Sequence, residues 1–244
     1  MKQVTAGSYS RLTQYEKCKY ATKLKVIDRI PEPDRGPPPK HLKEWQNDRG
    51  SRIHDHAEAF VTGNADGQLP EMIHFTDEFN HLRELFQAGL VVPEQLWCFD
   101  KDWKPCREDA WNKIRFRIKT DATVFYNPDR IKAIIIDYKT GRRKGNEMSH
   151  EQQKQLYAIG AFLMFPELEY ALTELYYLDL PDEPTYPTGY TRVQAMALLK
   201  RSWGPRNNKL LNELVFKPSP SVFACKWCPY NLKQGSKACK HAII

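Results

Sequence analysis

The segment from Ile131 to Gly141 places a short β-branched run directly before an acidic residue and a lysine. The run from Ala133 to Ile136 is apolar and bounded by polar residues, which predicts a buried strand. Asp137 and Lys139 then put two charges at the edge of the interior, where charges are stable only with partners. A surface ion pair would satisfy this pattern. A metal ion on the aspartate and a phosphate on the lysine would satisfy it as well. The rest of the sequence is needed to choose between an ion pair and a metal-and-phosphate site.

Size and composition indicate a globular protein with a polyanionic partner. The 244 residues suffice for one large domain, or for one domain with a small appendage. No segment approaches the roughly 20 apolar residues that span a bilayer, and the first residues lack an apolar signal sequence. We therefore expect a cytoplasmic protein with no membrane partner. The net charge of +7 favours a polyanion without identifying it.

Three consecutive runs predict an antiparallel meander that carries two aspartates. Residues 91–103 and 114–126 are strand-like, and the turn signal at 127–130 leads into the strand described above. Asp121 and Asp137 then lie on neighbouring strands, where opposite side chains are about 5 Å apart. Two carboxylates at that distance repel each other unless a cation lies between them.

Helices are predicted before and after this meander in the chain. Residues 40–62 form a long helix, on which His54 and Glu58 share a face. Residues 149–165 form another, with a Ser149–Gln152 capping box and with Gln153 and Tyr157 on one face. The remaining expected elements are a helix over 8–27 capped by Ser10, a proline-rich loop over 31–39, a helix over 76–90, a strand over 170–180, and one or two helices over 190–215 interrupted at 203–205.

Six cysteines in a cytoplasmic protein are expected to be reduced thiols or metal ligands. Cys225 and Cys228 have a metal-binding spacing, and Cys239 follows. Three thiolates leave a tetrahedral metal site one ligand short. Cys18 or His241 would supply the fourth ligand. The alternative is a set of unrelated reduced thiols.

The order of these motifs resembles the PD-(D/E)XK nuclease superfamily, and within it the RecB-type nucleases of helicase–nuclease complexes, CRISPR systems and phages. The resemblance rests on the following series: Cys18, His54, Asp121, Asp137-Tyr138-Lys139, Gln153-x-x-x-Tyr157 and Cys225-x-x-Cys228…Cys239. It implies an α/β (α+β) fold with a restriction-endonuclease-like core, a central mixed sheet flanked by helices, and N- and C-terminal segments joined by a cysteine metal site. It also implies one nuclease domain over 1–244, with its core at about 40–180 and a cysteine subregion formed by 8–27 and 216–244.

The resemblance also assigns roles to residues. Asp121, Asp137, His54 and the Tyr138 backbone carbonyl would bind Mg²⁺ or Mn²⁺. Lys139 would orient water or stabilise charge on the phosphate, with Gln153 and Tyr157 in support. Cys18, Cys225, Cys228 and Cys239 would hold a [4Fe–4S] cluster, with Zn²⁺ as the alternative. Glu94 matches an acidic position of some relatives and ranks below these ligands.

The implied activity is metal-dependent hydrolysis of DNA, as an exonuclease on duplex ends or single strands in recombination, repair or phage DNA processing. A bacterial or phage-infected host cytosol would be its location. The sequence has no Gly-x-x-x-x-Gly-Lys-Ser/Thr motif, so a helicase or recombinase would act in trans. The expected DNA contacts are Trp45, Arg49, Arg52, Arg142, Arg143 and Lys144.

Three features depart from the family pattern. Ile118, Lys119 and Thr120 precede Asp121 where many relatives have a glycine, and Lys19 follows Cys18 where proline is common. The gap from Cys228 to Cys239 is also longer than usual. Two other functions stay open. One is a non-catalytic DNA-binding or assembly subunit that retains the fold. The other is a zinc-stapled interaction protein.

Overall fold

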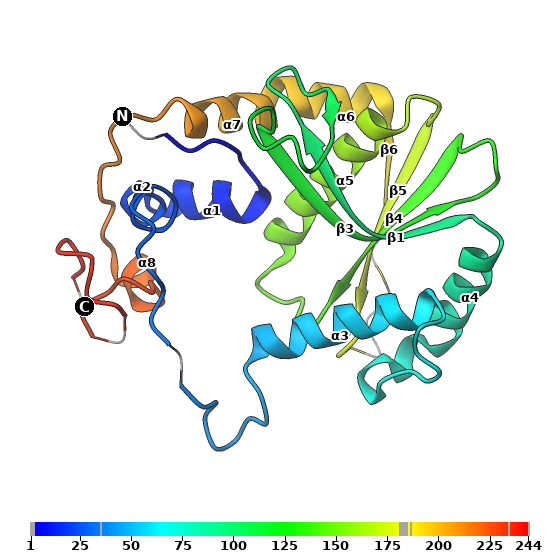
Figure 1. The fold of residues 1–244 in the computed structure, drawn as a ribbon, viewed down its shortest axis with the longest axis horizontal. Coiled ribbons are helices and arrows are strands. Elements are labelled where there is room, and N and C mark those ends of the chain that lie inside the picture. The colour runs from blue at the N-terminus through cyan, green and yellow to red at the C-terminus, as the bar shows by residue number, and fades with distance from the viewer. Residues whose placement is uncertain (1–2, 35, 181–184, 186, 234, 244) are drawn as a thin grey trace.

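The computed structural model describes residues 3–34, 36–180, 185, 187–233 and 235–243, and it is built around one mixed sheet. The strand order is β2-β1-β3-β4-β5-β6 (Figure 1). The three runs predicted as a meander pair antiparallel, whereas β4 and β5 are parallel and are connected through a helix. The strands are β1 (Val91–Phe99), β2 (Pro105–Cys106), β3 (Phe116–Phe125), β4 (Lys132–Lys139), β5 (Tyr170–Tyr177) and β6 (Thr188–Thr191).

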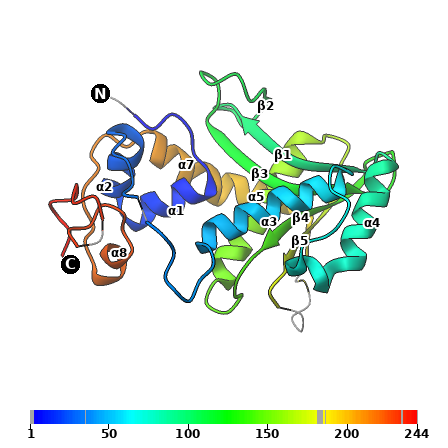
Figure 2. The same ribbon diagram turned by 60° about the horizontal axis from the view of Figure 1, so that its bottom comes forward.

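Helices cover both faces of the sheet (Figures 1 and 2). On one face lie α3 (Gln46–Val61) and α4 (Thr76–Gln87), preceded by a 3₁₀ turn at Pro70–Phe75. On the other lie α5 (Glu147–Met164), α6 (Arg192–Leu198) and α7 (Gly204–Leu211), with a π-helical turn at Leu199–Trp203 between the last two. The smaller elements near the chain ends are α1 (Tyr9–Lys17), α2 (Lys19–Thr22), a π-helical turn at Lys23–Ile27, and α8 (Val222–Lys226).

Strand β4 is buried on both faces, as its continuous apolar run predicted. Ile135 packs in the core beneath α5, and Ile136 packs in the core beneath α3 and α4. The strand therefore holds the polar residues at its carboxyl end between two packed layers.

The regular alternation of side chains between the two faces of the sheet is interrupted at Glu94 in β1 and Asp121 in β3. Ile118 packs on the α5 side, whereas Ala122, which simple alternation would place on the same side, packs on the α3 side. The β1–β3 pairing skips Glu94 and Asp121, and the backbone of Glu94 has a φ of +27°. Both strands thus switch faces at this irregularity, which is the kind of local distortion that re-aims side chains beside active sites.

Three predicted helix starts are wrong in detail. The cap of α1 is Ser8, whose hydroxyl accepts from the Arg11 amide, rather than Ser10. Helix α3 begins at Gln46, because Trp45 is extended and its indole donates to the Gly36 carbonyl. Helix α5 begins at Glu147, two residues before the predicted capping box.

The Ser149 side chain has another partner in place of the predicted cap. It lies inside the first turn of α5, and its hydroxyl is 2.8 Å from the Tyr9 hydroxyl. Tyr9 belongs to α1, so this contact joins α1 to α5 instead of closing a helix end.

The two ends of the chain pack together beside the sheet (Figure 2). Ala21 and Leu24 from the N-terminal segment form a small apolar cluster with Tyr230 from the C-terminal segment. Leu12 and Tyr15 of α1 belong to the main core under α5, which attaches this end region to the sheet. Within the described residues, no helix is long and apolar enough to cross a bilayer.

Gly160 sets how closely α5 approaches the sheet. A Cβ at this position would lie 2.6 Å from Trp97 and 2.9 Å from Ile118. We expect Gly160→Val to destabilise the fold by about 1–3 kcal/mol through overpacking, lowering Tm by roughly 2–4 °C per kcal/mol. Thermal denaturation followed by circular dichroism measures this shift. Gly67→Val is the control, because a Cβ there meets no atom within 4 Å; equal melting of the two variants would contradict the packing argument.

Candidate active site

The carboxyl end of β4 gathers the residues that the sequence singled out. Asp121 comes from β3, Asp137, Tyr138 and Lys139 from β4, His54 from α3, and Gln153 and Tyr157 from α5. Side-chain contacts link these residues into two groups, and the Asp137–Tyr138 peptide bond joins the groups to each other. The groups are His54–Asp121–Tyr138 and Tyr157–Asp137–Lys139–Gln153. The predicted constellation is therefore one contiguous cluster in the structure.

The Asp121 carboxylate replaces a bond of the sheet. Regular β3–β4 pairing ends at Ala122 opposite Ile136, and the next bond runs from the Tyr138 amide to Asp121 Oδ2 at 2.6 Å. The other oxygen, Oδ1, lies 3.0 Å from His54 Nδ1. The pKa of Asp121 is raised because it is buried and because Asp137 is near, although the contacts with His54 and the amide oppose this shift.

Asp137 is held from two sides. The Tyr157 hydroxyl donates to its Oδ1, and Lys139 Nζ lies 2.5 Å from its Oδ2. Oδ2 is buried and has no hydrogen-bond partner among the described residues, so the lysine supplies charge there without a well-directed bond. Burial and the charge of Asp137 raise the pKa of Tyr157, which keeps this phenol protonated as a donor.

Lys139 and His54 complete the cluster. Lys139 donates to Gln153 Oε1 at 2.9 Å, so α5 fixes the position of the ammonium group. Burial opposes protonation of His54, but the hydrogen bond and charge of Asp121 outweigh it and raise the histidine pKa. Gly50 lets α3 come close to this strand end, since a Cβ there would lie 3.3 Å from Thr140 Oγ1.

These donors suit a hard divalent cation. Two carboxylates and a backbone carbonyl are oxygen ligands of the kind that Mg²⁺ and Mn²⁺ prefer, and an imidazole adds a nitrogen that suits Mn²⁺. Asp137 Oδ2 makes no hydrogen bond within the described residues, so a cation that binds it displaces the Lys139 ammonium group and no hydrogen bond. Across the described parts of the chain, however, no three His, Cys, Asp or Glu side chains already stand together as a metal site. In this state, hydrogen bonds and the lysine occupy the carboxylates.

A second pair of carboxyl groups lies beside Asp121. Glu94 is opposite Asp121 at the gap in the β1–β3 ladder, and its carboxylate is 2.5 Å from Lys119 Nζ. Burial and the nearby Glu94 raise the pKa of Glu58, four residues after His54 on α3. Glu94, ranked below the other ligands from the sequence, is thus close to the cluster.

Arg49 and Arg52, which were predicted to contact DNA, form ion pairs within the protein. Arg49 makes a two-pronged bond with Asp179 at 2.8 and 2.6 Å, and Asp179 also accepts from the Gly141 amide at 2.5 Å. Arg52 bonds Glu44 and Glu71, each at 2.6 Å. These arginines therefore fix α3 and the loop after β4. Arg142 and Lys144 are exposed in that loop, Arg143 is half-buried, and Trp45 bonds the Gly36 carbonyl.

Sequence reasoning missed Asp179 and His150. Asp179 follows β5 directly, so an acidic residue at a strand end was a signal that could have been used. His150 Nδ1 lies 2.8 Å from the Tyr177 hydroxyl. Burial and the charge of Lys139 lower the His150 pKa, which places this histidine at the margin of the cluster. A histidine one residue after Ser149 in an amphipathic helix gave no such signal.

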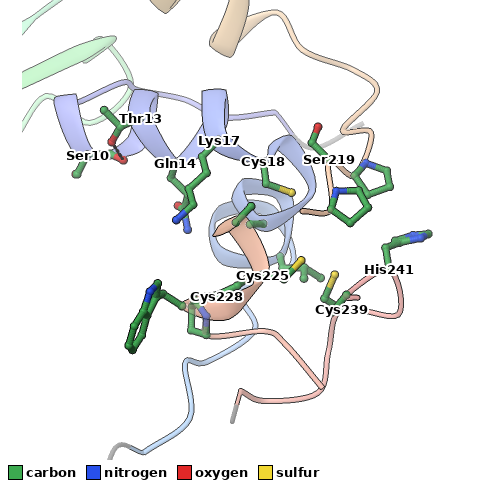
Figure 3. Close-up of a pocket in the computed structure, with 18 residues that line it drawn as sticks. Ser10, Thr13, Gln14, Lys17, Cys18, Ser219, Cys225, Cys228, Cys239 and His241 are labelled. Atoms are coloured by element: carbon green, nitrogen blue, oxygen red, sulfur yellow. Dashed lines mark hydrogen bonds between the residues drawn. The ribbon is translucent and has the colours of Figure 1, made fainter. Parts of the chain in front are cut away.

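The four cysteines predicted as one set line a single cavity of about 280 Å³ between α1, α2 and α8 (Figure 3). Burial raises the pKa of Cys228, a backbone hydrogen bond involving Tyr230 opposes the shift, and the other three thiols add to it. His241 also lines the cavity, but its ring packs edge-on against Tyr20 at 5.0 Å and points away from the sulfur atoms (Figure 3). The remaining two cysteines, Cys98 and Cys106, lie opposite each other on β1 and β2 and are free thiols.

The chain was compared with solved structures and with curated proteins. Two solved structures are similar, each at 13% identity. The crystal structure of SSO0001 has a TM-score of 0.40, with 100% of this chain and 90% of that chain covered. A protein from Eubacterium rectale named "Putative exonuclease" has a TM-score of 0.48, with coverage of 93% and 88%. A search of curated proteins found no match.

The family assignment rests on a match to the whole length of the fold. The model of the PD-(D/E)XK nuclease superfamily matches residues 6–232, a range that includes every element from α1 to α8 and the entire cluster at the end of β4. The chain therefore belongs to the PD-(D/E)XK nuclease superfamily.

Proposed function

We propose that this protein is a metal-dependent deoxyribonuclease of the RecB type that acts as an exonuclease on DNA ends or single strands. The observation that carries this proposal is the cluster at the carboxyl end of β4. There, the buried Asp137 Oδ2 lacks a hydrogen-bond partner among the described residues, and Lys139 lies beside it. A buried carboxylate oxygen whose partner is an ammonium group, without a hydrogen bond, suits exchange of that partner for a divalent cation, and the freed ammonium group suits a phosphate.

Asp121 and Asp137 are the proposed ligands of Mg²⁺ or Mn²⁺, with His54 and the Tyr138 carbonyl as further ligands. When bound, the ion would lower the pKa of water and neutralise charge on the phosphate. The Tyr138 amide holds Asp121 in place, and the Tyr157 hydroxyl fixes the orientation of Asp137. Both carboxylates are thus oriented by groups that remain protonated at neutral pH.

Lys139 is the proposed phosphate-binding and water-orienting residue. Gln153 holds its Nζ at 2.9 Å, which positions the ammonium group before substrate arrives. A preorganised positive charge lowers the energy of the pentacovalent phosphorus state more than a mobile one does. Glu94 lies opposite Asp121 at the gap in the β1–β3 ladder and is a further candidate ligand.

The four-cysteine cavity is proposed to hold a [4Fe–4S] cluster, with Zn²⁺ as the alternative. Cys18 is favoured over His241 as the fourth ligand, because the histidine ring packs on Tyr20 instead of facing the thiols. A cluster at this place would join α1 and α2 to the C-terminal segment, so its proposed role is structural. We place the nuclease in recombination, repair or phage DNA processing, with a helicase or recombinase as the partner that supplies a motor.

Asp137→Asn and Lys139→Ala should each reduce DNA cleavage at least about 100-fold, because the first removes the charge of a metal ligand and the second removes a positive charge beside the phosphate. End-labelled single- and double-stranded DNA is incubated with Mg²⁺ or Mn²⁺, and the products are separated by size. Chelation of the metal should abolish cleavage by the wild type.

Asp129→Asn and Lys132→Ala are matched controls, since both residues are exposed at the opposite end of β4. They should cut like the wild type. A wild type that cleaves no DNA, or site variants that cleave as fast as these controls, would favour a non-catalytic DNA-binding subunit.

Cys228→Ser should remove bound iron and sulfide and lower Tm, because one of four ligands is lost. Anaerobic preparation followed by metal analysis and visible absorbance measures this loss independently of nuclease activity. Cys106→Ser, on β2 and outside the four-cysteine cavity, serves as the control and should retain iron. A colourless wild type with one equivalent of zinc would replace the iron–sulfur assignment with the zinc alternative.

A further inference from the structure

A basic groove lies on the α1 side of the sheet, outside the cluster at the end of β4. Its volume is about 620 Å³. Four cationic side chains line it, contributed by α1, the turn after α2, and β3: Arg11, Lys25, Arg29 and Arg117. None of the described residues that line this groove is acidic. A hollow with this charge attracts a polyanion.

The groove continues toward the candidate active site. A smaller cavity of about 190 Å³ is lined by Gln153 and Tyr157, which contact Lys139 and Asp137. This cavity and the basic groove share Ser8, Ser10 and Arg117 as lining residues. The two hollows therefore adjoin along the first turn of α1 and the first half of β3.

The positive charge in the groove is uncompensated at its centre. Burial lowers the pKa of Arg11, and the charge of Arg117 lowers it further, so the two guanidinium groups repel each other. The Arg11 guanidinium donates to the Ala6 carbonyl at 2.5 Å, which fixes its position without neutralising it. Lys25 has a partner in Glu32 at 2.6 Å, but both of these side chains are about half exposed. A bound phosphate would relieve the repulsion between the two arginines.

The start of α1 adds to this potential. Ser8 caps the helix, and no acidic residue occupies the first turn. The amino end of a helix carries a partial positive charge that favours anions. Lys119, two residues beyond Arg117 on β3, lines the smaller cavity, where its charge is paired with the Glu94 carboxylate.

Trp111 supplies an aromatic surface at the same groove. Its side chain is 66% exposed, and the Arg117 guanidinium lies 5.6 Å from the centre of its ring. An exposed tryptophan beside phosphate-binding cations is the arrangement that single-strand binding proteins use to stack bases. In a duplex the base faces are already stacked, so an exposed ring of this kind selects for unpaired nucleotides.

We propose that the groove formed by Arg11, Lys25, Arg29, Trp111 and Arg117 binds single-stranded DNA and guides that strand along β3 to the active site. The arginines contact the phosphates, and Trp111 stacks on one base. This inference rests on the proposed nuclease function for its claim that the strand runs toward the active site. The binding itself requires no catalysis and is tested separately.

The test is fluorescence anisotropy of labelled oligo-dT with the full-length protein in the absence of divalent metal. Trp111→Ala should weaken binding about 5-fold or more, because stacking contributes on the order of 1 kcal/mol or more per base. The double variant Arg29→Ala/Arg117→Ala should reduce the slope of log Kd against log salt concentration by about 1.4, since each single-strand phosphate contact contributes about 0.7.

The matched controls are Tyr126→Ala and the double variant Arg130→Asn/Lys132→Ala, at exposed positions after β3 and at the start of β4 that do not line the groove. They should bind oligo-dT like the wild type, and circular dichroism should show native folding for every variant. Unchanged affinity and salt slope in the folded groove variants would overturn the proposal. A loss of affinity for blunt duplex DNA as large as that for oligo-dT would overturn the assignment to single strands.

The groove and the nuclease function can fail independently. If the groove variants lose binding while Asp137→Asn still cleaves DNA, the groove stands and the proposed catalytic cluster fails. If Asp137→Asn abolishes cleavage while the groove variants bind and cleave like the wild type, the nuclease function stands and the groove proposal is wrong.

Discussion

The interaction on which the site depends is the bond between the Tyr138 amide and the Asp121 carboxylate. Here a side chain takes the place of a backbone carbonyl in the β3–β4 ladder, after regular pairing ends at Ala122 and Ile136. A buried amide without an acceptor would destabilise the sheet by about 1–3 kcal/mol, so the carboxylate closes the ladder. The same bond fixes one of the two aspartates beside the other.

This bond lies within a wider irregularity of the sheet. Strands β1 and β3 change faces together at Glu94 and Asp121, and their pairing resumes in the same register on both sides. The distortion is stable because regular pairs and packed apolar side chains flank it. Polar side chains therefore collect at one break in a rigid sheet, between a layer of helices on each face, instead of on a mobile loop.

Charge is distributed unevenly over the molecule. At the end of β4, carboxylates, a lysine and a histidine neutralise one another, and the arginines of α3 pair with acidic residues. Beside α1, arginines face a groove without acidic lining residues. The segments from the two chain ends meet around the cysteines, next to α1. Helix α1 thus lies between the cysteine cavity and the basic groove, and Tyr9 ties it to α5.

The sequence by itself determined the meander, the helix on each side, and the acidic, basic and amide residues of the cluster, because apolar periodicity and local spacing report which residues share a strand or helix face. It did not determine the face switch at Glu94, the pairing of Arg49 with Asp179, or the groove formed by Arg11, Trp111 and Arg117. Glu94 and Asp121 are 27 positions apart, Arg11 and Arg117 are 106 apart, and Arg49 and Asp179 are 130 apart. Tertiary packing alone decided these features, since no local pattern specifies which distant side chain an arginine meets.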